Sequence, residues 1–481
     1  MMSQENEPRS CDTTSVPSVA QEFEKIDLGD PRLDRRVKQI VARCAEAPDH
    51  SFPELMSSRS ELELTYRLLG NERVSPPELL RPHLTETLAR VEAAKTALIV
   101  HDTSEMSFPG DELREGLSWF SKERQGFLLH AALALSADGL RRPLGVIGTL
   151  PWVREVGGKK SGPEFEAKKE SLRWFKLVEE VQGRVDAVAD LIHLMDREGD
   201  AYELLASMVK GSHRFIVRMC HDREVLGEEG AEQLRVRAAL GQAELHLERD
   251  VKVSKRGSKK RGPPRAVQKF GPREKRTAHV TIKAMPLIIK RSSECRRKDL
   301  PDSISVNVIH VIELSPPAGA EPVEWLLMTT EPITTKEDVE RLVDYYRARW
   351  TIEEFFKALK TGCAYESRQL TSYDALLRAL MIFLPLAWRV LLLRTVARVS
   401  PDTEASTVLS KTEIAVLRTR TKLPPMPSAR DALLAVARLG GHLSNNGDPG
   451  WLVLARGMEK LVLLSAGWDA SEQAASRGSI G

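Results

Sequence analysis

Hydrophobic positions recur with two different periods along the chain. Between residues 21 and 90 the recurrence is helical, and five apolar positions share one face: Leu33, Val37, Ile40, Val41 and Cys44. Four short apolar runs then have the length of buried strands: 97–101, 127–135, 143–150 and 191–195. A helical pattern over residues 164–182 separates the last two runs. We therefore predict a disordered start over residues 1–20, a helical N-terminal segment and then an α/β region.

Two of the predicted strands lead directly into an aspartate. Asp102 follows the run 97–101, and Asp196 follows the run 191–195. In a parallel or mixed sheet, polar residues at strand ends gather at the edge where active sites form. A lone aspartate after a strand more often caps the next helix, and we expect that role for Asp200, with Glu203 three residues later.

The segment Leu342–Lys360 has the pattern of a charged helix. At about 100° per residue, four polar side chains fall within an arc of roughly 60°: Tyr346, Arg349, Glu353 and Lys360. A carboxylate, two cations and a phenol would then project together, with Lys357 as a weaker rival for Lys360. The alternative is a solvated helix stabilised by pairs such as Arg349–Glu353.

The interval between Asp196 and Glu353 is too long for one loop inside a compact domain, so we expect a folded insertion there. Three strand-like runs lie within it: 280–282, 306–314 and 325–329. They predict a β-rich insertion spanning residues 222–334. Trp325 is the first residue of the last run. Its side chain could either pack in the core or take part in the functional site.

Basic residues concentrate in one stretch, although the 481-residue chain has a net charge of only +3. Residues 252–276 contain eleven Lys or Arg against one acid, Glu274, interspersed with Gly and Pro. An exposed loop of this charge suits a phosphate backbone, and a solvated loop without a ligand is the alternative. Lys259, Lys260 and Arg261 in this stretch, and Arg218 before it, are candidate phosphate contacts.

The remaining patterns argue against a zinc site, a disulfide scaffold and a membrane span. The five cysteines are far apart and form no CxxC pair. The most apolar run, 375–393, contains two arginines and Pro385, which favours a buried helix that is bent or broken at Pro385. Beyond it we expect a basic, proline-rich linker over 411–427, and two amphipathic helices over 431–439 and 451–464.

Three acidic motifs occur in order: HDTSEMSF around Asp102, MDREGDAYELL around Asp196 and YYRARWTIEEFFKALKTGC around Glu353. Together they resemble the insertion-sequence-four family of bacterial transposases, and the resemblance covers nearly the whole chain. It implies a ribonuclease-H-like catalytic core in which the three acids bind Mg²⁺, with Mn²⁺ as a substitute. The implied reaction is phosphodiester hydrolysis that frees a 3′-hydroxyl, a DNA hairpin intermediate, and joining of that hydroxyl to target DNA.

The resemblance also implies which residues contact DNA. Tyr346, Arg349 and Lys360 would hold the phosphate next to a flipped base, and Trp325 would stack on that base. Three arginines match family positions that grip the transposon end: Arg32, Arg36 and Arg67. Leu33 stands where a family member has another arginine. Without the resemblance, ordinary solubility would be the favoured role for these arginines.

By the same resemblance the chain divides into three parts. Residues 1–90 form a helical domain that binds the DNA end, 91–385 the α/β catalytic domain with its β-rich insertion, and 386–481 a helical dimerisation domain. The expected partners are double-stranded DNA, at the transposon end and at the target, and a second copy of the chain on DNA, with no nucleotide and no membrane. A bacterial cytoplasmic location is expected. The competing hypotheses are a nuclease of the same fold without strand transfer and a DNA-binding partner without catalysis.

Overall fold

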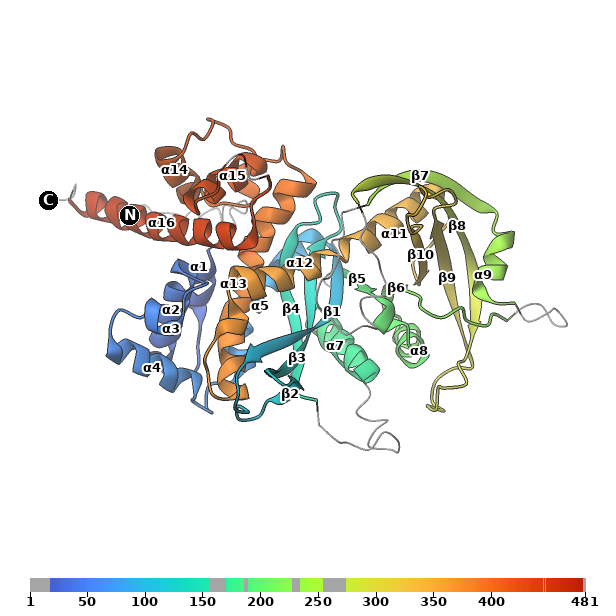
Figure 1. The fold of residues 1–481 in the computed structure, drawn as a ribbon, viewed down its shortest axis with the longest axis horizontal. Helices are drawn as coiled ribbons and strands as arrows, with labels where there is room; N and C mark the ends of the chain where they lie inside the picture. Colours follow the sequence, from blue (N-terminus) through green and yellow to red (C-terminus); the bar gives the residue numbers. More distant parts are fainter. Residues whose placement is uncertain are drawn as a thin grey trace, which may run out of the picture.

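The computed structural model describes residues 18–154, 170–185, 189–226, 234–253, 274–443, 445 and 447–478. Over these residues one mixed ten-stranded sheet forms the centre of the molecule, and helices cover both of its faces (Figure 1). Of the start predicted to be disordered, residues 1–17 lie outside the described residues, as do Lys259, Lys260 and Arg261. Residues 18–20 are wrongly included in that prediction, because Ser18 caps a short helix that begins at Val19. The described chain is therefore a mixed α/β fold.

Five strands make up the middle of the sheet. In spatial order they are β4 (Pro143–Trp152), β3 (Arg124–Ser136), β1 (Thr96–Pro109), β5 (Asp190–Met195) and β6 (Arg214–Arg218). The first three are antiparallel to one another, whereas β1, β5 and β6 are parallel. The short β2 (Ser118–Ser121) pairs with the start of β3. Parallel neighbours require crossovers, which α7 (Glu170–Val185) and α8 (Tyr202–Lys210) supply.

The predicted β-rich segment continues this sheet beyond β6. Its strands follow in the spatial order β10 (Glu324–Thr329), β9 (Ser303–Ile312), β8 (Arg276–Lys290) and β7 (Leu245–Val253). All of these pairings are antiparallel, and β7 and β8 are paired up to Val253 opposite Arg276. The short helices α9 (Val236–Ala239) and η3 (Leu240–Gln242) precede β7.

Helices on the two faces bury opposite sets of strand residues. On one face, α7 and α8 pack over β4 and β6 (Figure 1). On the other lie α11 (Lys336–Ala348), α12 (Thr351–Lys357) and α13 (Tyr373–Val399), while α5 (Pro76–Ala94) runs along β4. The indole nitrogen of Trp388 in α13 donates to the carbonyl of Pro143 in β4 at 2.9 Å, which ties this helix to the sheet.

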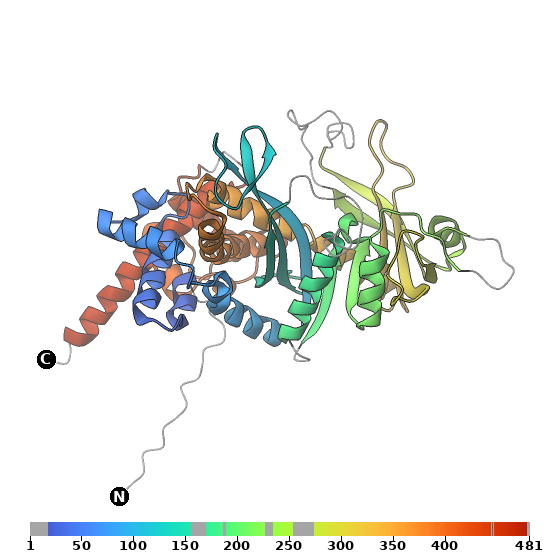
Figure 2. The ribbon, with the colours of Figure 1, turned by 90° about the horizontal axis from the view of Figure 1, so that it is seen from below.

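The helices at the two ends of the chain pack together. The N-terminal group contains α1 (Val19–Glu22), η1 (Phe23–Lys25), α2 (Pro31–Glu46), α3 (Phe52–Leu55) and α4 (Arg59–Leu69). The C-terminal group contains η6 (Ala405–Thr407), α14 (Lys411–Arg420), α15 (Ala429–Leu439) and α16 (Trp451–Gly478). Helix α16 contacts α2 and projects beside the N-terminal helices in both views (Figures 1 and 2). One hydrophobic cluster runs through both groups and the sheet.

Three expectations about helices are wrong. The segment Leu342–Lys360 is not one helix, because α11 ends at Ala348, α12 starts at Thr351, and a π-helical turn, η4 (Ala358–Gly362), follows. Helix α13 is not broken at Pro385, because tertiary packing on all sides compensates for the lost hydrogen bond, and a bend there stays a prediction. The supposed linker 411–427 begins with α14, started by a Ser410–Glu413 capping box.

Helix α13 is long and apolar enough to cross a membrane by length and composition, but its apolar stretch is entirely buried among the described residues. Its two interior arginines are used inside the protein. Arg378 donates to the carbonyls of Val74 and Leu69, at 2.7 and 3.0 Å. Arg389 pairs with Glu413 at 2.8 Å. The helix is therefore the central core helix onto which the end groups pack.

Candidate active site

The pleat of the sheet places Asp102 and Asp196 on one face. Side chains alternate along a strand, so Asp102 shares the face of Leu98 and Val100, and Asp196 shares that of Leu194. The parallel ladder between β1 and β5 ends with Val100 opposite Leu194, two residues before each acid. The sequence predicted that Asp102 follows the end of its strand. This is wrong, because β1 continues to Pro109, paired with β3. Asp102 lies where β1 loses its partner β5.

Glu353 reaches this face from α12, which packs across β1. The chain turns at Arg349 and Trp350 between α11 and α12, and this turn directs Arg349 into the site. The Arg349 guanidinium lies 2.6 Å from a Glu353 carboxylate oxygen and 3.7 Å from one of Asp102. The structure therefore brings Asp102, Asp196, Arg349 and Glu353 into one acidic centre.

Charges in this centre are partly desolvated. Burial, together with the nearby charges of Asp196 and Glu353, raises the pKa of Asp102 to about 7, while Arg349 opposes the shift. Burial also raises the pKa of Glu353, against the lowering effect of Arg349. Carboxylates that raise one another's pKa need a cation to remain ionised together. In the described structure Arg349 provides part of that charge.

The carboxylates suit a divalent metal ion in their chemistry. One oxygen of Asp102 accepts the Thr103 N–H at 2.9 Å, and one of Asp196 accepts the Glu198 N–H at 2.8 Å, which leaves each acid a second oxygen. Carboxylate oxygens of this kind are preferred by Mg²⁺ and Mn²⁺. In a compact metal site, one oxygen of each carboxylate would lie within 4.8 Å of the others. Asp102, Asp196 and Glu353 do not meet this condition in the described structure.

Three aromatic and basic residues line the same face beside the acids. Arg218 on β6 and Trp325 on β10 have the strand parity of the acidic face, and Tyr346 comes from α11 above them. The Tyr346 and Trp325 rings lie 6.4 Å apart, and Arg218 donates to the carbonyl of Glu324 at 2.9 Å. Tyr346 is buried and Trp325 half-buried against the core. These residues therefore extend the site along β5, β6 and β10.

Lys360 lies on the β1 side of the acids. The π-helical turn η4 directs its ammonium group to the carbonyl of Glu105, at 2.5 Å, and to Glu366, at 3.3 Å. Its sequence rival Lys357 instead pairs with Glu354 at 2.6 Å and lies over the exposed Trp350 ring. The structure thus separates the two lysines and places Lys360 along the strand that carries Asp102.

The three arginines predicted to bind the transposon end line a single groove on the N-terminal helices. Arg32 and Arg36 from α2 and Arg67 from α4 surround a space of about 460 Å³, together with Arg35 and Leu33. Arg36 is hydrogen-bonded to Gln39 at 2.9 Å. Arg35 was not singled out from the sequence, although it shares the RLDRR run with the others. The groove presents a basic surface on the N-terminal helices.

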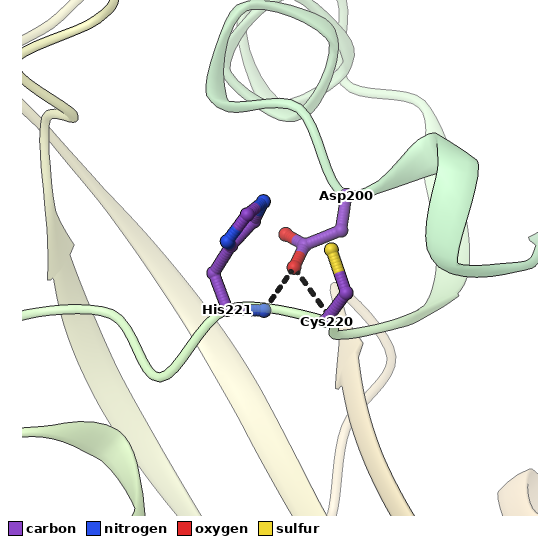
Figure 3. A group of neighbouring side chains, drawn as sticks. All are labelled: Asp200, Cys220 and His221. Atoms are coloured by element: carbon purple, nitrogen blue, oxygen red, sulfur yellow. Dashed lines mark hydrogen bonds between the residues drawn. The ribbon is translucent and has the colours of Figure 1, made fainter. Parts of the chain in front are cut away.

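Asp200 is not the helix cap expected from the sequence. Helix α8 has Ala201 at its N-cap and no side-chain cap. The buried Asp200 carboxylate instead accepts the N–H groups of Cys220 and His221, at 2.7 and 3.0 Å (Figure 3), and two hydrogen bonds from Arg223. These four donors occupy the lone pairs of the carboxylate, so the Asp200, Cys220 and His221 group is a structural link and not a metal site.

A layer of buried histidines behind the acids was missed in the sequence. His101 on β1 and His193 on β5 share a hydrogen bond of 2.9 Å, and His130 on β3 bonds to the Thr103 hydroxyl at 2.9 Å. Burial lowers the pKa of His130 to about 3 and those of the other two well below their ordinary value, so all three are neutral. The signal was present in the sequence, since His101 and His193 interrupt otherwise apolar strands.

Fold and site together define an α/β protein with a desolvated acidic centre on a mixed sheet. Comparison with known families then adds two matches. A transposase DNA-binding family model matches residues 17–74, and a transposase DDE-domain family model matches residues 203–386. The chain therefore contains a transposase DNA-binding domain and a DDE transposase domain, which implies a ribonuclease-H-like core. The first match includes the arginine groove, and the second includes Glu353 but starts after Asp102 and Asp196.

One solved structure is also similar in part. A cryo-EM structure of the piggyBac transposase synaptic complex with hairpin DNA aligns with 80% of this chain and 72% of its own chain. The sequence identity is 10% and the TM-score 0.36. At this level the likeness supports no argument about mechanism.

Proposed function

We propose that this protein is a cut-and-paste DNA transposase of the insertion-sequence-four type, similar to the transposon five enzyme. It would hydrolyse phosphodiester bonds at the transposon ends, pass through a DNA hairpin, and join the freed 3′-hydroxyls to target DNA. The observation that carries this proposal is the convergence of Asp102, Asp196 and Glu353 on one face of the sheet, in a chain with a DDE transposase domain.

Each acidic residue has a defined part in the proposed reaction. Asp102, Asp196 and Glu353 would hold Mg²⁺, or Mn²⁺ as a substitute, through their free carboxylate oxygens. When bound, such ions activate an attacking oxygen and stabilise a leaving one. The buried histidine layer keeps β1 and β5 fixed behind the acids without adding charge.

The residues beside the acids would hold the DNA strand. Arg349 and Lys360 offer cationic donors to phosphate oxygens, and the Tyr346 hydroxyl a further donor. Trp325 would stack on a base drawn out of the duplex, next to Tyr346. Arg218, on the same face, would contribute a second cation near that base.

The groove of Arg32, Arg36 and Arg67 would bind the transposon end, because it lies within the transposase DNA-binding domain. Lys259, Lys260 and Arg261 would add phosphate contacts. We keep the division into residues 1–90, 91–385 and 386–481 as functional regions, although the boundary at 385 falls inside α13. On DNA the protein would be a homodimer through its C-terminal helices, acting in the bacterial cytoplasm.

The test is a cleavage assay with DNA that carries the inverted ends flanking the coding region. Asp102→Ala, Asp196→Ala and Glu353→Ala should each abolish cleavage in Mg²⁺ while end binding, measured by gel shift, remains near normal. Glu337→Ala, on the exposed first turn of α11, is the matched control and should cleave normally. Cleavage that persists in one variant would remove that residue from the acidic centre.

The same assay separates the competing functions. Wild-type protein that binds the ends but yields no cut product in Mg²⁺ or Mn²⁺ would be a DNA-binding partner without catalysis. Cutting without joined product would indicate a nuclease. The proposed transposase requires nicked, hairpin and joined products in succession.

A further inference from the structure

Arg349 lies between two of the three acids that would hold the proposed metal ions. Its side chain is only 13% exposed, and its two terminal nitrogens lie near two different carboxylates, those of Asp102 and Glu353. The turn between α11 and α12 holds the base of this side chain in place. The guanidinium is therefore an internal cation built into the acidic centre.

We infer that Arg349 competes with metal ions for the carboxylates of Asp102 and Glu353, and that binding of a DNA phosphate relieves this competition. The inference rests on the proposed function. It deepens that function by making metal loading depend on DNA, so that the site is completed only on its substrate.

Competition follows from shared ligands. The Glu353 oxygen that accepts Arg349 at 2.6 Å cannot at the same time give its full charge to a metal ion. Two cations a few ångströms apart in a partly desolvated site also repel each other strongly.

One nitrogen of Arg349 lacks an acceptor. Its Nη1 atom is buried without a hydrogen-bond partner, and the nearest carboxylate oxygen of Asp102 is 3.7 Å away, beyond hydrogen-bond distance. A buried donor without an acceptor is unfavourable, and guanidinium groups pair particularly well with phosphate. A phosphate of bound DNA would satisfy Nη1 and draw the guanidinium from the carboxylates.

Linkage makes the effect reciprocal. If DNA favours the arrangement with Arg349 withdrawn, DNA must tighten metal binding, and metal must tighten DNA binding by the same factor. A chain without DNA would then load metal weakly, and unproductive hydrolysis away from the transposon end would be suppressed.

The experiment measures Mn²⁺ binding without any cleavage, from the electron paramagnetic resonance signal of free Mn²⁺. Arg349→Gln removes the charge and should bind Mn²⁺ at least tenfold tighter than wild type in the absence of DNA. Arg349→Lys keeps the charge and should stay near wild type. Arg347→Gln is the matched control, because Arg347 pairs with Asp344 at 3.0 Å outside the centre, and it should leave the affinity unchanged.

A duplex carrying the transposon end, with a non-hydrolysable linkage at the cut, supplies the second arm. It should tighten Mn²⁺ binding at least tenfold for wild type and less than threefold for Arg349→Gln. Equal Mn²⁺ affinity of wild type and Arg349→Gln without DNA, in folded proteins of normal melting temperature, would overturn the inference.

Failure of the proposed function gives a different result. Asp102→Asn should abolish the bound Mn²⁺ in both wild type and Arg349→Gln. Mn²⁺ binding that survives Asp102→Asn would refute the acidic metal site itself. Binding that depends on Asp102 but not on Arg349 would refute only the competition.

Discussion

Asp102 shows how a single side chain is changed by its surroundings. Its carboxyl group is partly buried beneath α12, next to two other acids, and its pKa rises to about 7 despite Arg349. In an unfolded chain the same group has a pKa of about 4. The difference links the protonation of one residue to the stability of the whole protein.

The first prediction follows from the sign of this shift. Between about pH 4 and pH 7 the folded, metal-free protein retains the Asp102 proton that the unfolded chain has lost, so the free energy of unfolding falls as pH rises through this window. The Asp102→Asn variant should not show this fall in the free energy of unfolding. At pH 8 it should be more stable than wild type by about 1–3 kcal/mol, because a shift of one pKa unit corresponds to about 1.4 kcal/mol.

Urea unfolding of both proteins at pH 4.5 and pH 8, with a metal chelator, measures this difference. The two proteins should differ less at the lower pH. If the Asp102→Asn variant were less stable than wild type at pH 8, the raised pKa of Asp102 would be wrong.

The second prediction concerns Trp325, which is half-buried and 6.4 Å from Tyr346. If it stacks on a flipped base, Trp325→Ala should spare the first nick and slow hairpin formation. Stacking of one base contributes about 1–3 kcal/mol, which corresponds to roughly one to two orders of magnitude in rate.

Separate nicking and hairpin rates on intact and pre-nicked DNA ends test this role. An abasic nucleotide at the flipped position should partly rescue the variant, and Trp325→Phe should retain more activity than Trp325→Ala. Equal loss of both steps with a lower melting temperature would instead assign Trp325 to the core.

At the scale of elements, the crossing of α15 and α16 depends on two glycines. A methyl group on Gly440 would overlap the backbone carbonyl oxygen of Val453, and one on Gly457 would overlap that of Val436. The two helices therefore approach backbone to backbone, in the way that small residues permit. This crossing anchors the base of α16, the helix that projects from the body (Figure 2).

The third prediction uses Gly457 with Gly467 as its matched control. Replacing a helical glycine by alanine ordinarily stabilises a helix by about 1 kcal/mol. Gly457→Ala should instead destabilise the protein, by roughly 1–3 kcal/mol, because the helices must separate. Gly467→Ala, on the same helix with nothing within 4 Å, should be neutral or stabilising.

Chemical denaturation of the two variants beside wild type gives the comparison. If Gly457→Ala were as stable as Gly467→Ala, the close crossing of α15 and α16 would be wrong.

At the scale of the whole molecule, the basic run of residues 252–276 connects two paired strands. Val253 at the end of β7 lies opposite Arg276 at the start of β8, so a short turn could join the two paired strands at this point. Residues 254–273 lie outside the described residues. Their eight cations give the near-neutral chain a local concentration of positive charge.

The fourth prediction is that replacing residues 254–273 by a short Gly-Asn turn weakens DNA binding and flattens its salt dependence, with no change in fold. Each lost phosphate contact should reduce the slope of log affinity against log salt by about 0.9. Binding measured from 50 to 300 mM KCl gives the slope, and circular dichroism reports the fold. An unchanged slope would show that the run does not contact DNA.

Much of the fold was predictable because local patterns and secondary structure agree. The apolar runs became β1, β3, β4 and β5, and the two C-terminal amphipathic helices became α15 and α16. The breaks in helix 342–360, the continuity of α13 through Pro385 and the existence of α14 were not predicted. The first two depend on packing against segments distant in the chain, which outweighs local propensity. Helix α14 had a local signal, the Ser410–Glu413 capping box, which was overlooked in the sequence.

The sequence by itself determined the alternation of side chains along β1 and β5, and hence which acids can share a face. It also contained the order of the acidic motifs and the basic character of α2. Only the tertiary structure decided that Arg349 also approaches Asp102, that Lys360 reaches Glu366 and the carbonyl of Glu105, and that Asp200 is tied to Arg223. The physical reason is that strand parity is a local property, whereas charges meet through contacts between residues far apart in the chain.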